Sequence, residues 1–181
     1  RSMLLSNTEY LSLGRQIARL LGSSLEGASA DALRELARAY DPSAPEARIS
    51  AEVYLLHKFL LMQACVGVFP EPHVDHVVGG FVAALNEQAS RLELGAERQQ
   101  AMEEMWQLRA DQFEQPFSAD RTSFLDDAAD ACHWKRTISR FCHNIRELVP
   151  QPDLWSGSQG PSQTASRSVT HVLNEMIAAL G

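Results

Sequence analysis

The chain contains very little lysine. Only Lys58 and Lys135 are lysines, and the remainder of its 16 basic residues are arginines. The formal net charge is −7, whereas nucleic-acid binding depends on basic side chains that release condensed counterions from the phosphates. Few lysines combined with many alanines are typical of a GC-rich bacterial genome. The sequence therefore predicts a bacterial protein that has no nucleic-acid partner.

Cysteine is also scarce, and the three cysteines are odd in number. Cys132 and Cys142 fall in a segment expected to be helical, where their separation corresponds to about 15 Å of rise. That distance is too long for a disulfide. Cys65 lies among apolar neighbours and is interpreted as a small core residue. Free thiols are typical of a reducing compartment, so we expect a cytoplasmic protein.

The sequence carries no recognisable export signal or catalytic motif. Residues 4–9 contain neither a basic leader nor a long apolar run, and Arg1 and Ser2 are interpreted as remnants of a cloning site before Met3. The chain lacks a glycine-rich phosphate loop, a nucleophile elbow, a His-Glu-x-x-His motif and a Cys-x-x-Cys motif. We therefore expect a protein that is not an enzyme and has no cofactor.

The residues that are present favour a single helical domain. The 181 residues are 45% hydrophobic and 22% charged, which is an ordinary composition for one globular domain. Capping residues, proline stops and apolar residues at spacings of three and four predict an all-α, orthogonal or mixed bundle of six to seven helices over residues 3–181. The expected helices cover about residues 6–22, 29–41, 50–69, 72–90, 96–115, 123–149 and 168–180, with a flexible loop over about 150–167.

The third expected helix is the most apolar part of the chain. Over residues 53–69 the apolar side chains leave no polar face at about 100° per residue, which predicts a position in the centre of the bundle. A membrane span needs roughly 20 mostly apolar positions. Polar residues interrupt this stretch at Glu52, His57, Lys58 and Gln63. We therefore expect a core helix and no membrane partner.

Local signals predict several helix ends and one close contact. Ser6 and Glu9 form a capping-box pattern at the start of the first helix, and Ser50 is the predicted N-cap of the third. Gly79 and Gly80 fall within the fourth helix, where each glycine costs about 1 kcal/mol relative to alanine. This cost predicts a tight backbone approach to a neighbouring helix.

Polar residues on the expected core faces form the main candidate site. His57, Lys58 and Gln63 point in different directions from one helix, so at least one of them is expected to be buried. A buried polar group without a partner costs about 1–3 kcal/mol. Trp106 and Arg109 share the inner face of the fifth expected helix. These five residues are the candidate ligand pocket, and the alternative is a set of internally satisfied hydrogen bonds.

A weaker candidate for metal binding lies at the start of the fourth expected helix. His73 and His76 are three positions apart, a spacing that places two imidazoles on one helix face. No third ligand accompanies them in the sequence pattern. A solvated helix start is therefore the preferred interpretation, and we predict no metal site.

Two functions are consistent with these patterns. The first is a non-enzymatic regulatory or protein-interaction domain. Its partner would be another protein or a second copy of the chain, because residues 168–180 carry a continuous apolar face that must be buried. The alternative is a protein that binds a small ligand or a metal in a cavity beside the third helix.

Overall fold

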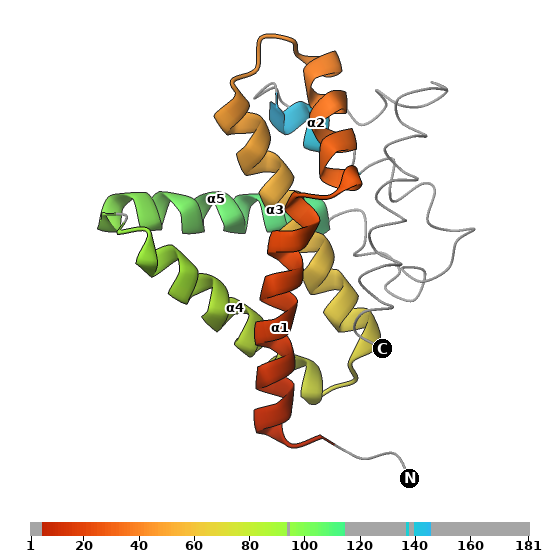
Figure 1. Cartoon of the computed structure of the whole chain (residues 1–181), viewed down its shortest axis with the longest axis vertical. Helices are drawn as coiled ribbons and strands as arrows, with labels where there is room; N and C mark the ends of the chain where they lie inside the picture. Colours follow the sequence, from red (N-terminus) through yellow and green to blue (C-terminus); the bar gives the residue numbers. More distant parts are fainter. Residues whose placement is uncertain (1–4, 94, 115–136, 138–139, 146–181) are drawn as a thin grey trace, which may run out of the picture.

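The computed structural model describes residues 5–93, 95–114, 137 and 140–145. Five helices follow one another in this part of the chain, and Thr137 and residues 140–145 are also helical (Figure 1). The helices are α1 (Asn7–Leu25), α2 (Ala28–Tyr40), α3 (Glu46–Val68), α4 (His73–Arg91) and α5 (Ala96–Glu114). The described ranges contain no strand, so the all-α prediction is confirmed. The expected loop over 150–167 and helix over 168–180 lie outside these ranges, as does most of the expected helix over 123–149.

The predicted start of the third helix is wrong by four residues. The helix begins at Glu46, and the carbonyl of Pro45 accepts hydrogen bonds from the N–H groups of Arg48 and Ile49 at 3.0 and 3.1 Å. Glu46 places a negative charge at the positive end of the helix dipole. Ser50 is an exposed residue inside the helix rather than its cap.

Smaller corrections apply to the first two helices. Helix α1 continues through Gly22 to Leu25, because an exposed glycine near the end of a helix weakens it without stopping it. Helix α2 begins after Gly27, so Ser29 lies in its first turn. At the start of α1 the predicted capping box is confirmed: the Glu9 carboxylate accepts from the Ser6 N–H at 2.6 Å, and the Ser6 hydroxyl accepts from the Glu9 N–H at 3.3 Å.

Helix α3 contacts each of the other four helices. It contributes buried side chains to two hydrophobic clusters, one shared with α2 and α5 and the other with α1 and α4. Neighbouring residues take opposite sides, since Leu60 belongs to the first cluster and Leu61 to the second. Among the described helices, α3 alone is long and apolar enough to span a membrane by length and composition, a test that a buried core helix also passes. Its central position in a complete bundle stays a prediction.

Helices α1 and α4 approach each other at two glycines. A β-carbon at Gly14 of α1 would overlap the carbonyl oxygen of Val77, and one at Gly80 of α4 would overlap the carbonyl oxygen of Leu11. At Gly79 the nearest atom would be the Leu11 Cδ2, at an ordinary 3.9 Å. The predicted close approach is therefore confirmed, and Gly80 is the residue that requires it.

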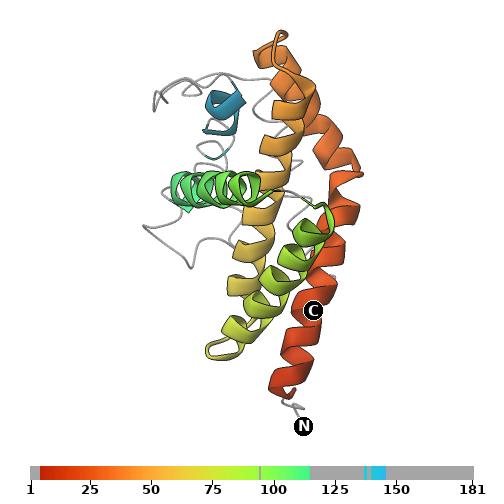
Figure 2. The same cartoon turned by 90° about the vertical axis from the view of Figure 1, so that its left-hand side faces the viewer.

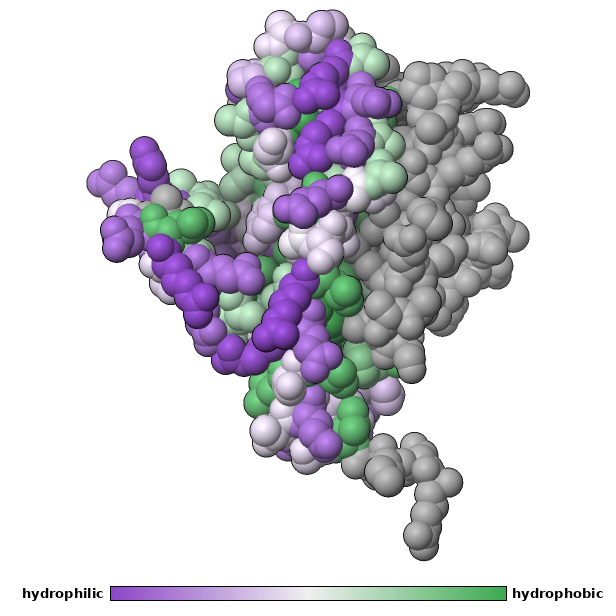
Figure 3. Space-filling model, viewed as in Figure 1, coloured by the Kyte–Doolittle hydropathy of each residue, from purple (hydrophilic) through white to green (hydrophobic). Residues whose placement is uncertain are grey.

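Helices α4 and α5 extend away from this contact and converge where α4 ends and α5 begins (Figure 1). Helix α5 runs crosswise to α1 and α3 and is viewed almost end-on in Figure 2. We call the converging parts of the two helices, residues 85–91 and 96–106, together with Leu92, the α4–α5 arm. Hydrophilic residues predominate along the α4 edge of this arm in the space-filling view (Figure 3).

Candidate functional site

A pocket lies between the α4–α5 arm and α3. Its volume is about 440 Å³, which is within the usual range of small-molecule sites, about 300–1,000 Å³. Three helices line it: α3 through Ala51, Tyr54, Leu55 and Lys58; α4 through Leu85, Asn86, Ala89 and Ser90; and α5 through Gln99, Met102, Glu103, Met105 and Trp106. We call this space the α3–α4–α5 pocket.

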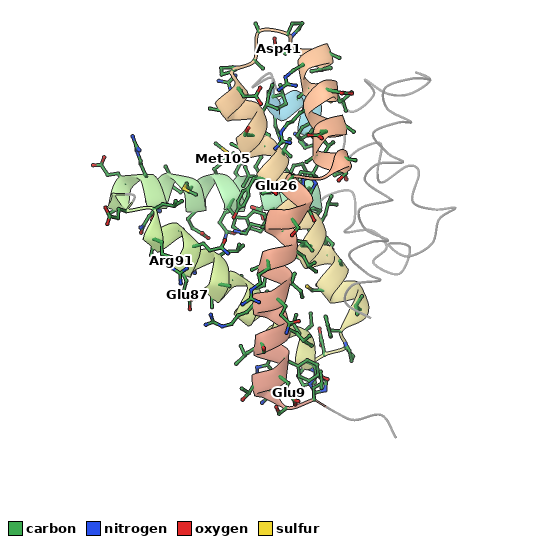
Figure 4. The ribbon with its side chains drawn as sticks, in the orientation of Figure 1. Glu9, Glu26, Asp41, Glu87, Arg91 and Met105 are labelled. Atoms are coloured by element: carbon green, nitrogen blue, oxygen red, sulfur yellow. The ribbon has the colours of Figure 1, made fainter. Side chains whose placement is uncertain are left out.

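The pocket is open because only one half of α5 packs against α3. Residues 96–105 are all exposed, whereas Trp106, Arg109 and Phe113 in the second half are buried. Met102 and Met105 stay 47% and 42% exposed although they line the pocket; Met105 is labelled in Figure 4. The first half of α5 therefore forms a wall with large apolar side chains that the described residues cover only in part.

Lys58 brings the positive charge of the pocket. Its ammonium lies 4.0 Å from the centroid of the Trp106 ring, which is the geometry of a cation–π interaction. Burial lowers the pKa of Lys58, and the nearby charge of Glu103 acts in the opposite direction. Within the described ranges the ammonium forms neither a hydrogen bond nor an ion pair. Three N–H donors are therefore available to a molecule in the pocket.

Tyr54 lies on the same face of α3 as Lys58. The two residues are four positions apart, and Ala51 and Leu55 complete a face at the spacing of one helix side. Burial raises the pKa of Tyr54, so its phenol is neutral at physiological pH. The α3 wall of the pocket thus combines apolar surface with one cation and one neutral hydroxyl.

Arg109 lies outside the pocket, in a buried ion pair with Glu52. Its Nε is 3.0 and 3.1 Å from the two carboxylate oxygens, and its Nη2 is 2.8 Å from Oε1. Its Nη1 donates to the side chain of Gln112 at 3.0 Å. The side chains of Arg109 and Glu52 are 10% and 5% exposed. The charge of Arg109 is therefore neutralised inside the protein. Of the two interpretations of Arg109, a ligand contact or internally satisfied hydrogen bonds, the structure shows the second.

His57 and Gln63 also face away from the pocket. His57 is 1% exposed, and its Nδ1 donates to the carbonyl of Val53, whose oxygen is 2.8 Å away. Burial lowers the pKa of His57, and its Nε2 has no hydrogen-bond partner among the described residues. Gln63 donates to the Glu114 carboxylate at 2.8 Å. The expectation of at least one buried polar residue on this helix thus holds for His57.

The structure therefore brings two of the five predicted pocket residues together. Lys58 and Trp106 face the same pocket, while His57, Gln63 and Arg109 do not line it. Sequence reasoning missed Glu52 as the partner of Arg109, although a lone carboxylate in an apolar run is a signal that it needs a buried cation. The i, i+3, i+4, i+7 spacing of Ala51, Tyr54, Leu55 and Lys58 could also have predicted the α3 wall.

The weaker metal candidate gains no support. Across the described ranges there is no group of three or more His, Cys, Asp or Glu side chains that could hold a metal ion. The ring of His73 stacks on Tyr10 instead, with centroids 4.5 Å apart, and Tyr10 also meets Phe69 edge-on. His73 therefore takes part in an aromatic cluster where α1 meets the start of α4.

No family model matches this chain, and neither a curated protein nor a solved structure is significantly similar to it. The function must therefore be argued from the geometry of the pocket.

Proposed function

We propose that the protein is a non-enzymatic binding protein that holds a small, mainly apolar ligand in the α3–α4–α5 pocket. The observation that carries this proposal is the pocket itself, about 440 Å³ in volume and lined by apolar side chains with a few polar groups among them. Such a combination is typical of ligand sites, in which apolar contact supplies affinity and a few polar atoms fix orientation. It corresponds to the small-ligand alternative that the sequence allowed, with the cavity beside the third helix.

The α5 wall supports an apolar ligand. Met102 and Met105 are about half exposed, so a ligand between them and α4 would remove their apolar surface from water. Burial of apolar surface contributes about 25 cal/mol per Å². Methionine is unbranched and polarisable, which lets it fit ligands of irregular shape. We therefore expect the pocket to tolerate variation in the apolar part of its ligand.

A protein-interaction function is the second candidate. Leu108 on α5 is 49% exposed and lies one helical turn from Met105, while Leu92 at the tip of the arm is 66% exposed. These side chains could meet an apolar surface of a partner protein. We place this candidate second because the residues around the pocket form a concave site, whereas Leu92 and Leu108 stand apart. A homodimer through residues 168–180, a bacterial origin and a cytoplasmic location stay predictions.

Binding of the neutral hydrophobic dye Nile red tests the first candidate. The dye should bind at one site per chain, and its fluorescence should rise as it leaves water. An Ala89→Trp substitution places a large side chain on the α4 wall and should weaken binding about tenfold or more, which corresponds to about 1.4 kcal/mol. The matched control is Ala101→Trp, at an exposed position of α5 that does not line the pocket.

Circular dichroism should show that both tryptophan variants remain helical. Equal dye affinity of Ala89→Trp and Ala101→Trp would show that the dye does not use the pocket, and the proposal would then be abandoned. Native mass spectrometry of the purified protein addresses the second candidate, because it reports bound small molecules and subunit number together.

A further inference from the structure

We infer that the ligand of the pocket is an amphipathic carboxylate, whose carboxylate group contacts Lys58 and whose aliphatic body lies between α4 and α5. This inference rests on the proposed function and names the chemical class of the ligand.

The position of Lys58 argues for an anionic group. Among the described residues that line the pocket, Lys58 is the only basic one, and its ammonium is held over the face of Trp106. An aromatic face stabilises the positive charge but accepts none of its three N–H donors in a conventional hydrogen bond. A carboxylate accepts such donors and neutralises the charge. In a partly buried position this interaction is stronger than it is on an exposed surface.

The other walls argue for an aliphatic body. Leu85 and Ala89 from α4 face the same space as Met102 and Met105 from α5, which places apolar side chains on two sides of the pocket. A chain of methylene groups would contact both walls and cover the two half-exposed methionines. A compact anion such as phosphate would contact Lys58 but leave this apolar surface in water.

The charge of Glu103 provides a second, independent test of the sign of the ligand's charge. Its carboxylate is close enough to act on the ammonium of Lys58, and it also lines the pocket. A bound carboxylate would therefore experience attraction from Lys58 and repulsion from Glu103. Removal of the Lys58 charge should therefore lower the affinity for a carboxylate, and removal of the Glu103 charge should raise it. A bound cation would show the opposite two changes.

Isothermal titration calorimetry with decanoate, decanol and decylamine tests the inference, because these probes share one alkyl chain and differ in their end group. Decanoate should bind the wild-type protein about tenfold more tightly than decanol does. In Lys58→Met, which keeps the length of the side chain without its charge, decanoate should bind no better than decanol. In Glu103→Gln, the affinity for decanoate should rise a few fold, while that for decylamine should fall.

The probes separate the two levels of the argument. If decanol and decanoate bind wild type equally and Lys58→Met changes neither, or if decylamine binds most tightly, the carboxylate assignment is wrong while the apolar pocket stands. If no alkyl probe binds and Nile red does not bind either, the proposed function fails and the inference fails with it. Retained Nile red binding by Lys58→Met shows that this variant is folded and that its loss of decanoate binding reflects the missing charge.

Discussion

The two halves of α4 meet their neighbours in opposite ways. In the first half, Gly80 lies so close to the backbone of α1 at Leu11 that a β-carbon would not fit between the two helices. Towards its end, Leu85 and Ala89 face a hollow of about 440 Å³, with Met102 of α5 on the other side. Glycines thus close the first contact, whereas a pocket separates the helices at the second. The pocket lies beside the second half of α4, where α3 and α5 supply its other walls.

Helix α5 repeats this pattern with different chemistry. Its second half is fixed to α3 by the Arg109–Glu52 ion pair and by the contact of Phe113 with Phe59, whose ring centroids are 5.4 Å apart. Its first half is exposed and forms a wall of the pocket. The closed contacts should therefore determine stability, and the open region should determine binding.

The largest expected effect follows from removal of Arg109. Arg109→Met removes the cation that Arg109 provides to the Glu52 carboxylate, which is 5% exposed. Loss of one partner from a buried ion pair typically costs about 3–5 kcal/mol. Urea unfolding followed by circular dichroism should show a loss of this order. The double variant Arg109→Met with Glu52→Leu should recover much of it, because both partners of this ion pair are then removed together. If Arg109→Met were as stable as wild type, the Arg109–Glu52 ion pair would not be a contact that determines stability.

The glycine contact provides the next effect and its own controls. Gly80→Ala should lower the free energy of unfolding by about 1–3 kcal/mol, because the new β-carbon overlaps the Leu11 backbone. Alanine favours helix over glycine by up to about 1 kcal/mol, so where space exists the substitution should stabilise. Gly79→Ala and Gly22→Ala meet this condition. A β-carbon at Gly79 would make only an ordinary contact, and one at Gly22 would meet no neighbouring side chain or helix within 4 Å in the described part of the chain. If all three variants were stabilised, the close approach of α1 and α4 would be disproved.

The free energy of unfolding should depend on pH because His57 is buried in the core. Burial, with a smaller contribution from the charge of Arg34, lowers the pKa of His57 below its ordinary value of 6.5. The unfolded chain therefore binds a proton at a higher pH than the folded chain does. The resulting contribution to stability is fully present above about pH 6.5 and is lost as the pH falls towards the folded-state pKa.

The free energy of unfolding, measured between pH 8 and pH 5 (roughly the range over which a histidine of ordinary pKa changes charge), should test this dependence. His57→Gln should reduce the decline in stability on acidification, by up to about 1.4 kcal/mol per pH unit for one proton. Identical slopes for wild type and variant would mean that His57 is not the group that takes up the proton.

The smallest effect should come from the open region. Lys58→Met should change the free energy of unfolding by less than about 1 kcal/mol, because the lost cation–π interaction, worth about 0.5–1 kcal/mol, is offset by relief from desolvation of the ammonium. Thermal and urea unfolding should give near-wild-type midpoints. Strong destabilisation by Lys58→Met would place this residue among the structural contacts and weaken its assignment to ligand binding.

The helices were predictable because their signals are local. Proline, capping residues and apolar spacing act over one or two turns, so most predicted ends lie within three residues of the observed ones. The start of α3 was missed because, from sequence alone, Ser50 is as good a candidate for the N-cap as Pro45. The choice is made by the hydrogen bonds that the Pro45 carbonyl accepts.

The site was less predictable because its residues meet across helices. Helical periodicity shows that His57, Lys58 and Gln63 diverge, but it does not show which of them faces α5. Arg109 was expected on the inner face, where its burial requires a counter-charge, and Glu52 lies 57 positions earlier in the chain. Met102 and Met105 follow the apolar stripe of α5, and they are pocket residues only because residues of α3 and α4 lie across from them.

The scarcity of lysine has a consequence for the labelling chemistry of this protein. An amine-directed reagent finds only two ε-amino groups in the chain, and one of them, Lys58, is in the pocket. Because burial lowers the pKa of Lys58, a larger fraction of this amine is uncharged and nucleophilic near neutral pH than for an ordinary lysine. Acylation of Lys58, followed by peptide mass mapping, would therefore serve as a footprint of pocket occupancy. For the same reason, immobilisation of the protein through Lys58 would block the site that such an experiment is meant to observe.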